Sequence, residues 1–104
     1  MKALLINPKE RKVTEIELDG SLDSYYKAMD CTTFAVPIQF DNDDALYVDD
    51  DGVFKPRPLY GFKKKEWEYA IFGNAIIVGT DAEGNSIDCK SKPEDFNDLI
   101  FGVY

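Results

Sequence analysis

The chain has 104 residues, of which 44% are hydrophobic and 13% aromatic, and its formal net charge is −8 at pH 7. This length and apolar content are those of one folded domain with a modest core, and they exclude a disordered acidic chain. The negative charge disfavours nonspecific binding to duplex nucleic acid or to an anionic membrane, because both would repel the average surface. We therefore expect a soluble protein.

The start of the chain and its two cysteines indicate a reducing compartment. The apolar residues 1–6 are followed at once by Asn7-Pro8, so the stretch is too short for a secretory signal peptide, and no segment reaches transmembrane length. Without an export signal, Cys31 and Cys89 are expected to be reduced thiols and not a disulfide. The sequence therefore predicts a cytoplasmic protein.

The chain opens with the pattern of a β-hairpin followed by an amphipathic helix. Residues 3–6 form a short apolar run, and a looser strand-like pattern follows at residues 13–18. Apolar residues then recur with helical spacing at Leu22, Tyr25, Tyr26 and Met29. Ser21 is the expected N-cap of this helix, because its hydroxyl can accept a hydrogen bond from a free amide of the first turn.

Residues 33–40 change to the period of two that is typical of a strand. Phe34, Val36, Ile38 and Phe40 are expected to share one face of it. Pro37 lies inside this strand and has no backbone N–H to donate, so we expect the strand at a sheet edge or at a bulge.

Residues 41–52 hold six carboxylates and no basic residue. The apolar Leu46-Tyr47-Val48 separates two acidic clusters, so the pattern predicts one short buried strand with a charged turn at each end. Such turns would hold a candidate acidic surface for a host protein with a basic groove, and a simple solvated segment is the alternative. The residues of this acidic surface are Asp41, Asp43, Asp44, Asp49, Asp50 and Asp51.

Residues 53–69 reverse the charge, with five basic residues against two acidic ones. Their aromatic residues and two prolines predict an ordered loop more than a regular element. Cationic side chains attract anions and aromatic rings stack on bases, so the segment is a candidate site for a small ligand, a nucleotide or a single strand. The residues of this basic-aromatic surface are Tyr60, Phe62, Lys63, Lys64, Lys65, Trp67 and Tyr69. A loop whose aromatics pack on the core is the alternative.

The neighbouring acidic and basic segments have a third interpretation. They could pair with each other inside the domain or across a homodimer, so that the charge pattern serves assembly. High salt would dissolve such a self-complex, whereas it would leave a small-ligand site assembled.

The last third of the chain predicts a strand, a hairpin and a second helix. Ala75-Ile76-Ile77-Val78 is the most clearly buried strand, and the turn at residues 81–85 leads into a hairpin partner at residues 86–89. Ser91-Lys92-Pro93-Glu94 fits a capping box, with Phe96, Leu99, Ile100 and Val103 as the apolar stripe of a helix. The predicted fold is therefore one small α+β domain over residues 1–104, a mostly antiparallel sheet with two amphipathic helices.

The acidic segment does not fit a calcium-binding EF-hand loop. That loop needs oxygen donors at positions 1, 3 and 5, glycine at 6 and a carboxylate at 12. A frame that starts at Asp41 puts Ala45 and Leu46 at positions 5 and 6, and the frame that puts Gly52 at position 6 puts Pro58 at 12. Both frames fail. An irregular calcium or magnesium site stays open, with Asp43, Asp44, Asp49 or Asp51 as its ligands.

The absence of histidine restricts the chemistry further. It removes the usual general base, and two widely spaced cysteines cannot make a zinc knuckle. Neither glycine-rich nucleotide motif, G-x-G-x-x-G or G-x-x-x-x-G-K-[ST], is present. Twenty acidic residues do not by themselves make a catalytic carboxylate pair. We therefore expect a binding protein without cofactor or metal, and not an enzyme.

Three segments of the chain form a recognisable pattern: MKALLINP at residues 1–8, LYVDDDG at residues 46–52 and FGNAIIVGTD at residues 72–81. In this order they resemble the small bacterial and phage proteins grouped as domain of unknown function 3846. The resemblance implies a product of a phage, plasmid or integrated element, and it carries over no activity and no site residue. Lys63-Lys64-Lys65-Glu66-Trp67 lies outside the family pattern, so a function located there would be particular to this protein.

Overall fold

A six-stranded antiparallel sheet in the order β2-β1-β7-β4-β3, with β8 paired to β7, runs through the middle of the molecule. The structure is a computed structural model that describes residues 1–104. The strands of this sheet are β1 (Lys2–Asn7), β2 (Lys12–Glu17), β3 (Phe34–Gln39), β4 (Asp44–Asp49), β7 (Ala75–Thr80) and β8 (Ser86–Ile87).

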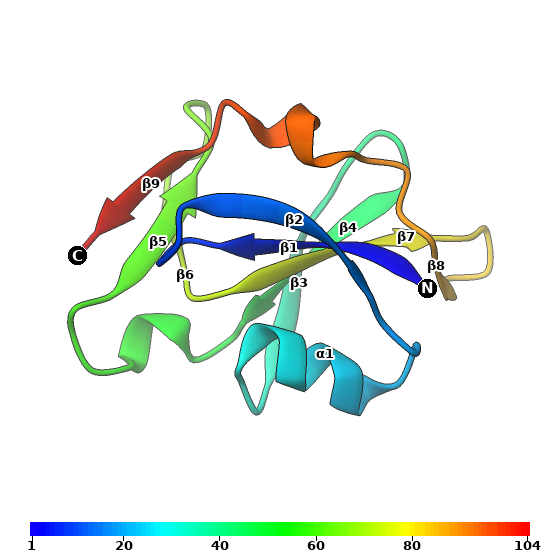
Figure 1. Ribbon diagram of the computed structural model, residues 1–104, viewed down its shortest axis with the longest axis horizontal. Coiled ribbons are helices and arrows are strands. Elements are labelled where there is room, and N and C mark those ends of the chain that lie inside the picture. Colours follow the sequence, from blue (N-terminus) through cyan, green and yellow to red (C-terminus); the bar gives the residue numbers. More distant parts are fainter.

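A helix and a second, smaller sheet cover this central sheet. The helix α1 (Leu22–Met29) lies on one side, and the smaller sheet lies toward the other with the order β6-β5-β9 (Figure 1). Its strands are β5 (Tyr60–Lys63), β6 (Ile71–Phe72) and β9 (Ile100–Val103), and two short 3-10 helices are η1 (Gly52–Phe54) and η2 (Pro93–Phe96). The α+β class and the antiparallel sheet are thus confirmed, with one α-helix in place of two.

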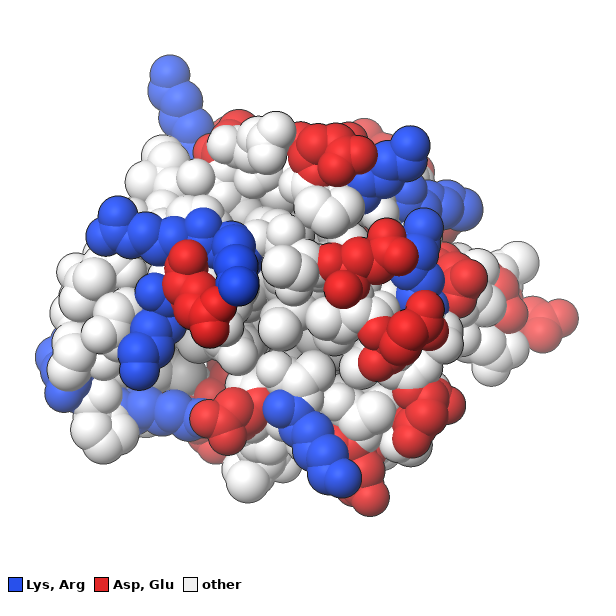
Figure 2. All heavy atoms as spheres, viewed as in Figure 1, with Lys and Arg blue, Asp and Glu red and all other residues white.

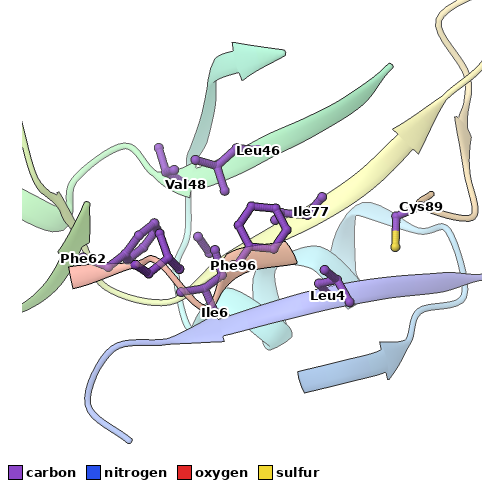
Figure 3. Packing of buried hydrophobic residues seen from close by; sticks show 10 residues of the cluster. Leu4, Ile6, Leu46, Val48, Phe62, Ile77, Cys89 and Phe96 are labelled. Atoms are coloured by element: carbon purple, nitrogen blue, oxygen red, sulfur yellow. The ribbon is translucent and has the colours of Figure 1, made fainter. Parts of the chain in front are cut away.

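Successive side chains of a strand point to opposite faces of the sheet. In the central strands β1, β4 and β7 both faces are covered, so the side chains are buried on both. One face packs against the second sheet and η2 in a cluster of Leu4, Ile6, Leu46, Val48, Phe62, Ala75, Ile77, Cys89, Phe96 and Leu99 (Figure 3). The other face packs against α1 in a cluster of Ala3, Leu18, Tyr25, Met29, Ile76 and Val78. Burial on both faces explains the unbroken apolar runs at residues 3–6 and 75–78.

The opening hairpin and the first helix form as predicted. β1 and β2 pair in antiparallel register from Lys2–Glu17 to Asn7–Lys12. The Ser21 hydroxyl accepts a hydrogen bond from the Ser24 amide at 3.2 Å and so caps α1. The helix ends at Asp30, which adopts the left-handed conformation with φ 53°.

The strand β3 lies at the sheet edge and contains a bulge between Ala35 and Ile38, as Pro37 predicts. The expectation of a single apolar face is wrong. The bulge inserts one extra residue, so Phe34 packs on the α1 side while Ile38 and Phe40 pack on the other. A period-of-two pattern cannot cross a bulge without changing face.

The buried strand Leu46-Tyr47-Val48 and the hairpin after β7 are confirmed. β4 is longer than the apolar triplet, because it includes Asp44 and Asp49. β8 pairs with β7 across the turn at residues 81–85, where the Asp81 carboxylate accepts hydrogen bonds from the Glu83 and Asn85 amides, both at 2.9 Å.

The second predicted helix is wrong. Pro93–Phe96 makes one 3-10 turn, and Ile100–Val103 continues as β9, which pairs with β5. Gly102 is a poor helix residue, and in β9 it lies directly opposite Gly61. Long-range pairing has therefore overridden a pattern that also fits a helix.

The predicted capping box is also wrong, because its serine has a distant partner. The Ser91 hydroxyl donates to Asp44 Oδ2 at 2.5 Å instead of capping η2. The carboxylate that reaches back to the Lys92 amide belongs to Asp95, at 2.9 Å, and not to Glu94.

The expectation that residues 53–69 form a loop is only partly right. Residues 55–59 are irregular, but Tyr60–Lys63 form β5, the central strand of the second sheet. This strand is short and contains Gly61, so its sequence gave no clear alternation.

Cys31 and Cys89 are both free thiols, as expected. Cys89 is buried in the core and Cys31 is half-buried beside the end of α1. None of the helices has the length and apolar character needed to cross a membrane.

Candidate ligand pocket

A pocket lies where β1 and β4 end and β7 begins. Its volume is about 310 Å³. Five segments form its wall: the β1–β2 turn, the end of α1, the end of β4 with η1, the 55–60 segment and the β6–β7 turn. The lining residues are Asn7, Pro8, Lys9, Met29, Asp30, Asp49, Gly52, Lys55, Pro56, Pro58, Leu59, Tyr60, Gly73 and Asn74.

An ion pair between Asp49 and Lys55 forms part of the wall. Lys55 Nζ lies 2.6 Å from Asp49 Oδ2 and donates to the Asp30 carbonyl oxygen at 3.1 Å. The Asp49 side chain is buried and accepts a second hydrogen bond, from the Asp51 amide at 2.9 Å. The hydrogen bond to Asp49 raises the pKa of Lys55, so this ammonium stays charged at neutral pH.

A second cation lies over an aromatic ring in the same wall. Lys9 Nζ is 5.8 Å from the centroid of the Tyr60 ring. Lys9 forms no ion pair within the chain, whereas Lys55 does. The side-chain oxygen of Asn7 accepts a hydrogen bond from the Glu10 amide at 3.2 Å, so the NH₂ group of Asn7 stays free to donate.

Two glycines are required by the backbone of this wall, one for a close approach and one for a positive φ. A Cβ on Gly52 would lie 2.4 Å from the Phe72 carbonyl oxygen, so no larger residue fits without movement. Gly73 has φ +90°, which L-residues rarely adopt, and an added Cβ would lie 4.0 Å from Asp49 Oδ2. Gly73 therefore allows the tight turn before β7 that brings this backbone beside Asp49.

The predicted acidic surface is divided by the fold. Asp44 is 0% exposed, and Asp49 is buried in the pocket wall, so neither contributes to an open surface. Asp41 and Asp43 are exposed at one end of β4, and Asp50 and Asp51 are exposed at the other. The structure therefore does not bring the six carboxylates together.

The buried Asp44 carboxylate is held by hydrogen bonds within the fold. Its carboxylate accepts hydrogen bonds from the Lys90 amide at 3.0 Å, the Ser91 amide at 2.8 Å and the Ser91 hydroxyl. The Asn42 side chain adds a longer contact at 3.4 Å. These bonds hold the 90–92 segment against the β3–β4 turn. Such saturation leaves Asp44 little capacity to bind another molecule.

The irregular cation site left open by the sequence lacks a common centre. Asp44 and Asp49 occupy opposite ends of β4, roughly 16 Å apart at the rise of a strand. No three His, Cys, Asp or Glu side chains come close enough together to hold one metal ion.

The predicted basic-aromatic surface is dispersed as well. Phe62 and the half-buried Trp67 belong to the core cluster, and their ring centroids lie 6.2 Å apart. Lys64 lies 3.8 Å from Asp98 and over the Phe96 ring. Lys63 is half-buried, Lys65 and Tyr69 are exposed, and only Tyr60 lines the pocket. Figure 2 shows Lys and Arg side chains gathered over the β5–β9 end and acidic side chains predominating at the β7–β8 end.

The sequence of this chain matches one known family over most of its length. The family model described as domain of unknown function (DUF3846) matches residues 1–99. The chain belongs to the DUF3846 family. No curated protein and no solved structure matches it.

The three segments that carry the DUF3846 resemblance meet at the pocket. The first supplies Asn7 and Pro8, the second supplies Asp49 and Gly52, and the third supplies Gly73 and Asn74. Sequence reasoning singled out Asp49 as part of the acidic surface and as a possible cation ligand, and it placed none of the other five residues in a site. The available signal was that every segment joins an apolar strand to a polar or glycine turn, because antiparallel neighbours bring such ends to one edge of a sheet.

Proposed function

We propose that this DUF3846 protein is a non-enzymatic binding protein. Its pocket takes a small anionic ligand with a planar ring, of the size of a nucleoside monophosphate. The observation that carries this proposal is the placement of Lys9 over Tyr60 in the wall of a polar pocket. A ring can stack on Tyr60 while its anionic group reaches the ammonium of Lys9.

The size and rigidity of the pocket support a small molecule. Its volume of about 310 Å³ lies at the lower end of the range for ligand sites. Pro8, Pro56 and Pro58 restrict two of the wall segments, the β1–β2 turn and residues 55–60, so little conformational freedom is lost on binding. Asn7 and Asn74 add amide groups that can orient a polar ring.

The state of the charged groups supports binding more than catalysis. Lys55 is held protonated by Asp49, so it is a poor nucleophile and a poor base at neutral pH. The two carboxylate oxygens of Asp49 are engaged, one by the Lys55 ammonium and one by the Asp51 amide. The pair therefore serves to shape the wall and to fix the position of one positive charge.

Calorimetric titration with a panel of nucleoside monophosphates tests the proposal. The wild-type chain is expected to bind at least one of them, and Lys9→Gln is expected to weaken binding about tenfold by removing a charge-assisted contact. Lys65→Gln is the matched control, because Lys65 is also an exposed lysine but lies outside the pocket. An equal loss in both variants, or no heat with the wild type, would contradict the proposal.

The family resemblance supports one further part of the proposal, that the gene belongs to a phage, plasmid or integrated element. Sequencing its genomic neighbourhood tests this. A host protein with a basic groove is a weaker candidate partner, because β4 separates the exposed carboxylates into two groups.

A further inference from the structure

Most sheet edges of this molecule are blocked against further pairing. β3 carries Pro37 and a bulge, and β2 carries exposed charges at Lys12, Glu15 and Glu17. β6 and β8 are only two residues long. Short strands, prolines, bulges and charges are the features by which proteins prevent edge-to-edge association.

β9 has none of these features. It forms one edge of the second sheet and consists of Ile100-Phe101-Gly102-Val103. Ile100 is 51% exposed, Val103 is 54% exposed and the adjoining Tyr104 is 45% exposed. An uncharged edge strand with exposed apolar side chains is a template for another strand. In Figure 1, β9 lies at the outside of the molecule, beyond β5.

The hydrogen-bond pattern shows which backbone groups face the open edge. Leu59 and Tyr104 exchange both bonds, with N···O distances of 2.8 and 2.7 Å. In an antiparallel ladder such pairs alternate with pairs that do not bond, so Gly102 and Ile100 also face β5. The N–H and C=O groups of Phe101 and Val103 therefore point outward.

We infer that a second copy of this chain pairs with β9, antiparallel and with two-fold symmetry about Gly102. In this register Phe101 lies opposite Val103 of the second copy, and the outward N–H and C=O groups of both residues are satisfied. Ile100 lies opposite Tyr104 of the second copy, so two of the exposed apolar side chains near this edge contact each other. The two small sheets then form one continuous sheet.

Glycine suits the centre of this register. The pair on the symmetry axis is of the non-bonded kind, in which Cα atoms approach to about 4.5 Å. Gly102 has no side chain to obstruct this approach. A Cβ added to Gly102 would lie 3.0 Å from the Tyr104 ring of the same copy, because this ring lies against the glycine. Tyr104 is held there by an edge-to-face contact with Phe72 at 5.1 Å.

The electrostatics separate this assembly from one driven by charge pairing. Each copy carries a net charge of −8, so the copies repel each other at long range, while β9 itself has no charged residue. Salt screens the repulsion without weakening backbone pairing. Dimerisation through β9 therefore strengthens with salt, whereas pairing of acidic and basic segments weakens.

Sedimentation velocity over a range of concentration and salt tests the inference. The wild type is expected to dimerise more tightly at high salt, and Val103→Lys to weaken the dimer roughly tenfold or more, because the symmetric interface contains the residue twice. Val36→Lys is the matched control, a 43% exposed valine on the blocked edge β3. A wild type that stays monomeric at all concentrations, or equal effects of both variants, overturns the inference.

Amide hydrogen exchange gives a second, mutation-free test. The Phe101 and Val103 amides are expected to become protected as the protein concentration rises. The Tyr104 amide, which already donates to Leu59 within one copy, serves as the internal control. Fast exchange of the Phe101 and Val103 amides in a sample that is dimeric by sedimentation overturns pairing through β9.

Discussion

Lys55 and Asp49 join two parts of the chain that the sequence alone does not connect. The Lys55 ammonium lies 2.6 Å from Asp49 Oδ2, so the segment after η1 is tied to the end of β4. This contact fixes one wall of the pocket, and its removal should be measurable in stability, in pH dependence and in the reactivity of a neighbouring thiol.

The ion pair predicts a loss of stability at alkaline pH. The Asp49 hydrogen bond raises the pKa of Lys55 above its ordinary value of 10.5. A group with a raised folded-state pKa contributes stability that is fully present below the unfolded-state pKa and is lost as pH rises through the folded-state pKa. The pair should therefore contribute constantly through neutral pH and fade above about pH 10.5. Urea unfolding of the wild type and Lys55→Met, compared from pH 7 to 11, should show the difference shrinking only in the alkaline range.

Replacing Lys55 at neutral pH should lower the free energy of unfolding by about 1 kcal/mol. The partly exposed lysine itself contributes little, but its removal leaves the buried Asp49 carboxylate without its partner. Lys90→Met is the control. Lys90 pairs with Asp43 at 3.8 Å, and both side chains are exposed, so this change should stay within about 0.5 kcal/mol. Equal losses of unfolding free energy in the two variants would show that the burial of Asp49 does not strengthen the Lys55–Asp49 pair.

Asp44 should be the most sensitive carboxylate of the acidic segment. Asp44→Ala leaves the buried Ser91 amide and hydroxyl without an acceptor, and should destabilise the fold by about 3 kcal/mol or more. Asp43→Ala at the neighbouring exposed position should cost about 1 kcal/mol or less, because it involves only the strain of its φ of 70° and an exposed ion pair with Lys90. Chemical denaturation of both variants measures the contrast, and a smaller effect at Asp44 would refute its structural role.

Gly52→Ala should destabilise the fold by about 1–3 kcal/mol through overpacking, because the new Cβ meets a backbone oxygen that cannot rotate away. It should also distort the pocket wall that η1 provides. Gly84→Ala is a suitable comparison, since Gly84 also resists substitution, through its φ of +85°, but has nothing within 4 Å. Only Gly52→Ala should then alter ligand binding, and a binding defect in both variants would point to a general loss of folding.

The thiol of Cys31 should report on the ion pair. Burial raises its pKa, the Asp49 carboxylate raises it further and Lys55 lowers it. Asp49→Asn should therefore lower the pKa and speed alkylation by iodoacetamide several-fold at pH 8, because more thiolate is present. Lys55→Met should slow the same reaction. Rates that do not change in opposite directions would show that the charges do not act on the thiol.

The local parts of the fold could be predicted from the sequence. The hairpin, the helix capped by Ser21 and the strand at residues 75–78 depend on neighbouring residues, and their patterns are unambiguous. Pro37 predicted that β3 lies at a sheet edge or contains a bulge, and the structure shows both, because one missing N–H has the same consequence in any sheet.

The parts that depend on distant partners could not be predicted. Ser91 fits a capping box until Asp44 is known to lie beside it, and Ile100–Val103 fits a helix until β5 offers a strand to pair with. The pocket has the same origin. Asn7, Asp49 and Gly73 come from three separated segments, and only the antiparallel order of β1, β7 and β4 brings them together.

A two-dimensional NMR titration with a nucleoside monophosphate tests the central proposal, ligand binding in the pocket, most directly. The account predicts saturable shifts of the Gly52 and Gly73 amides and of the Asn7 and Asn74 side-chain amides, all of which line the pocket. Signals of residues 63–65 should stay in place. Shifts confined to residues 63–65, or no saturable shifts with any member of the panel, would contradict it.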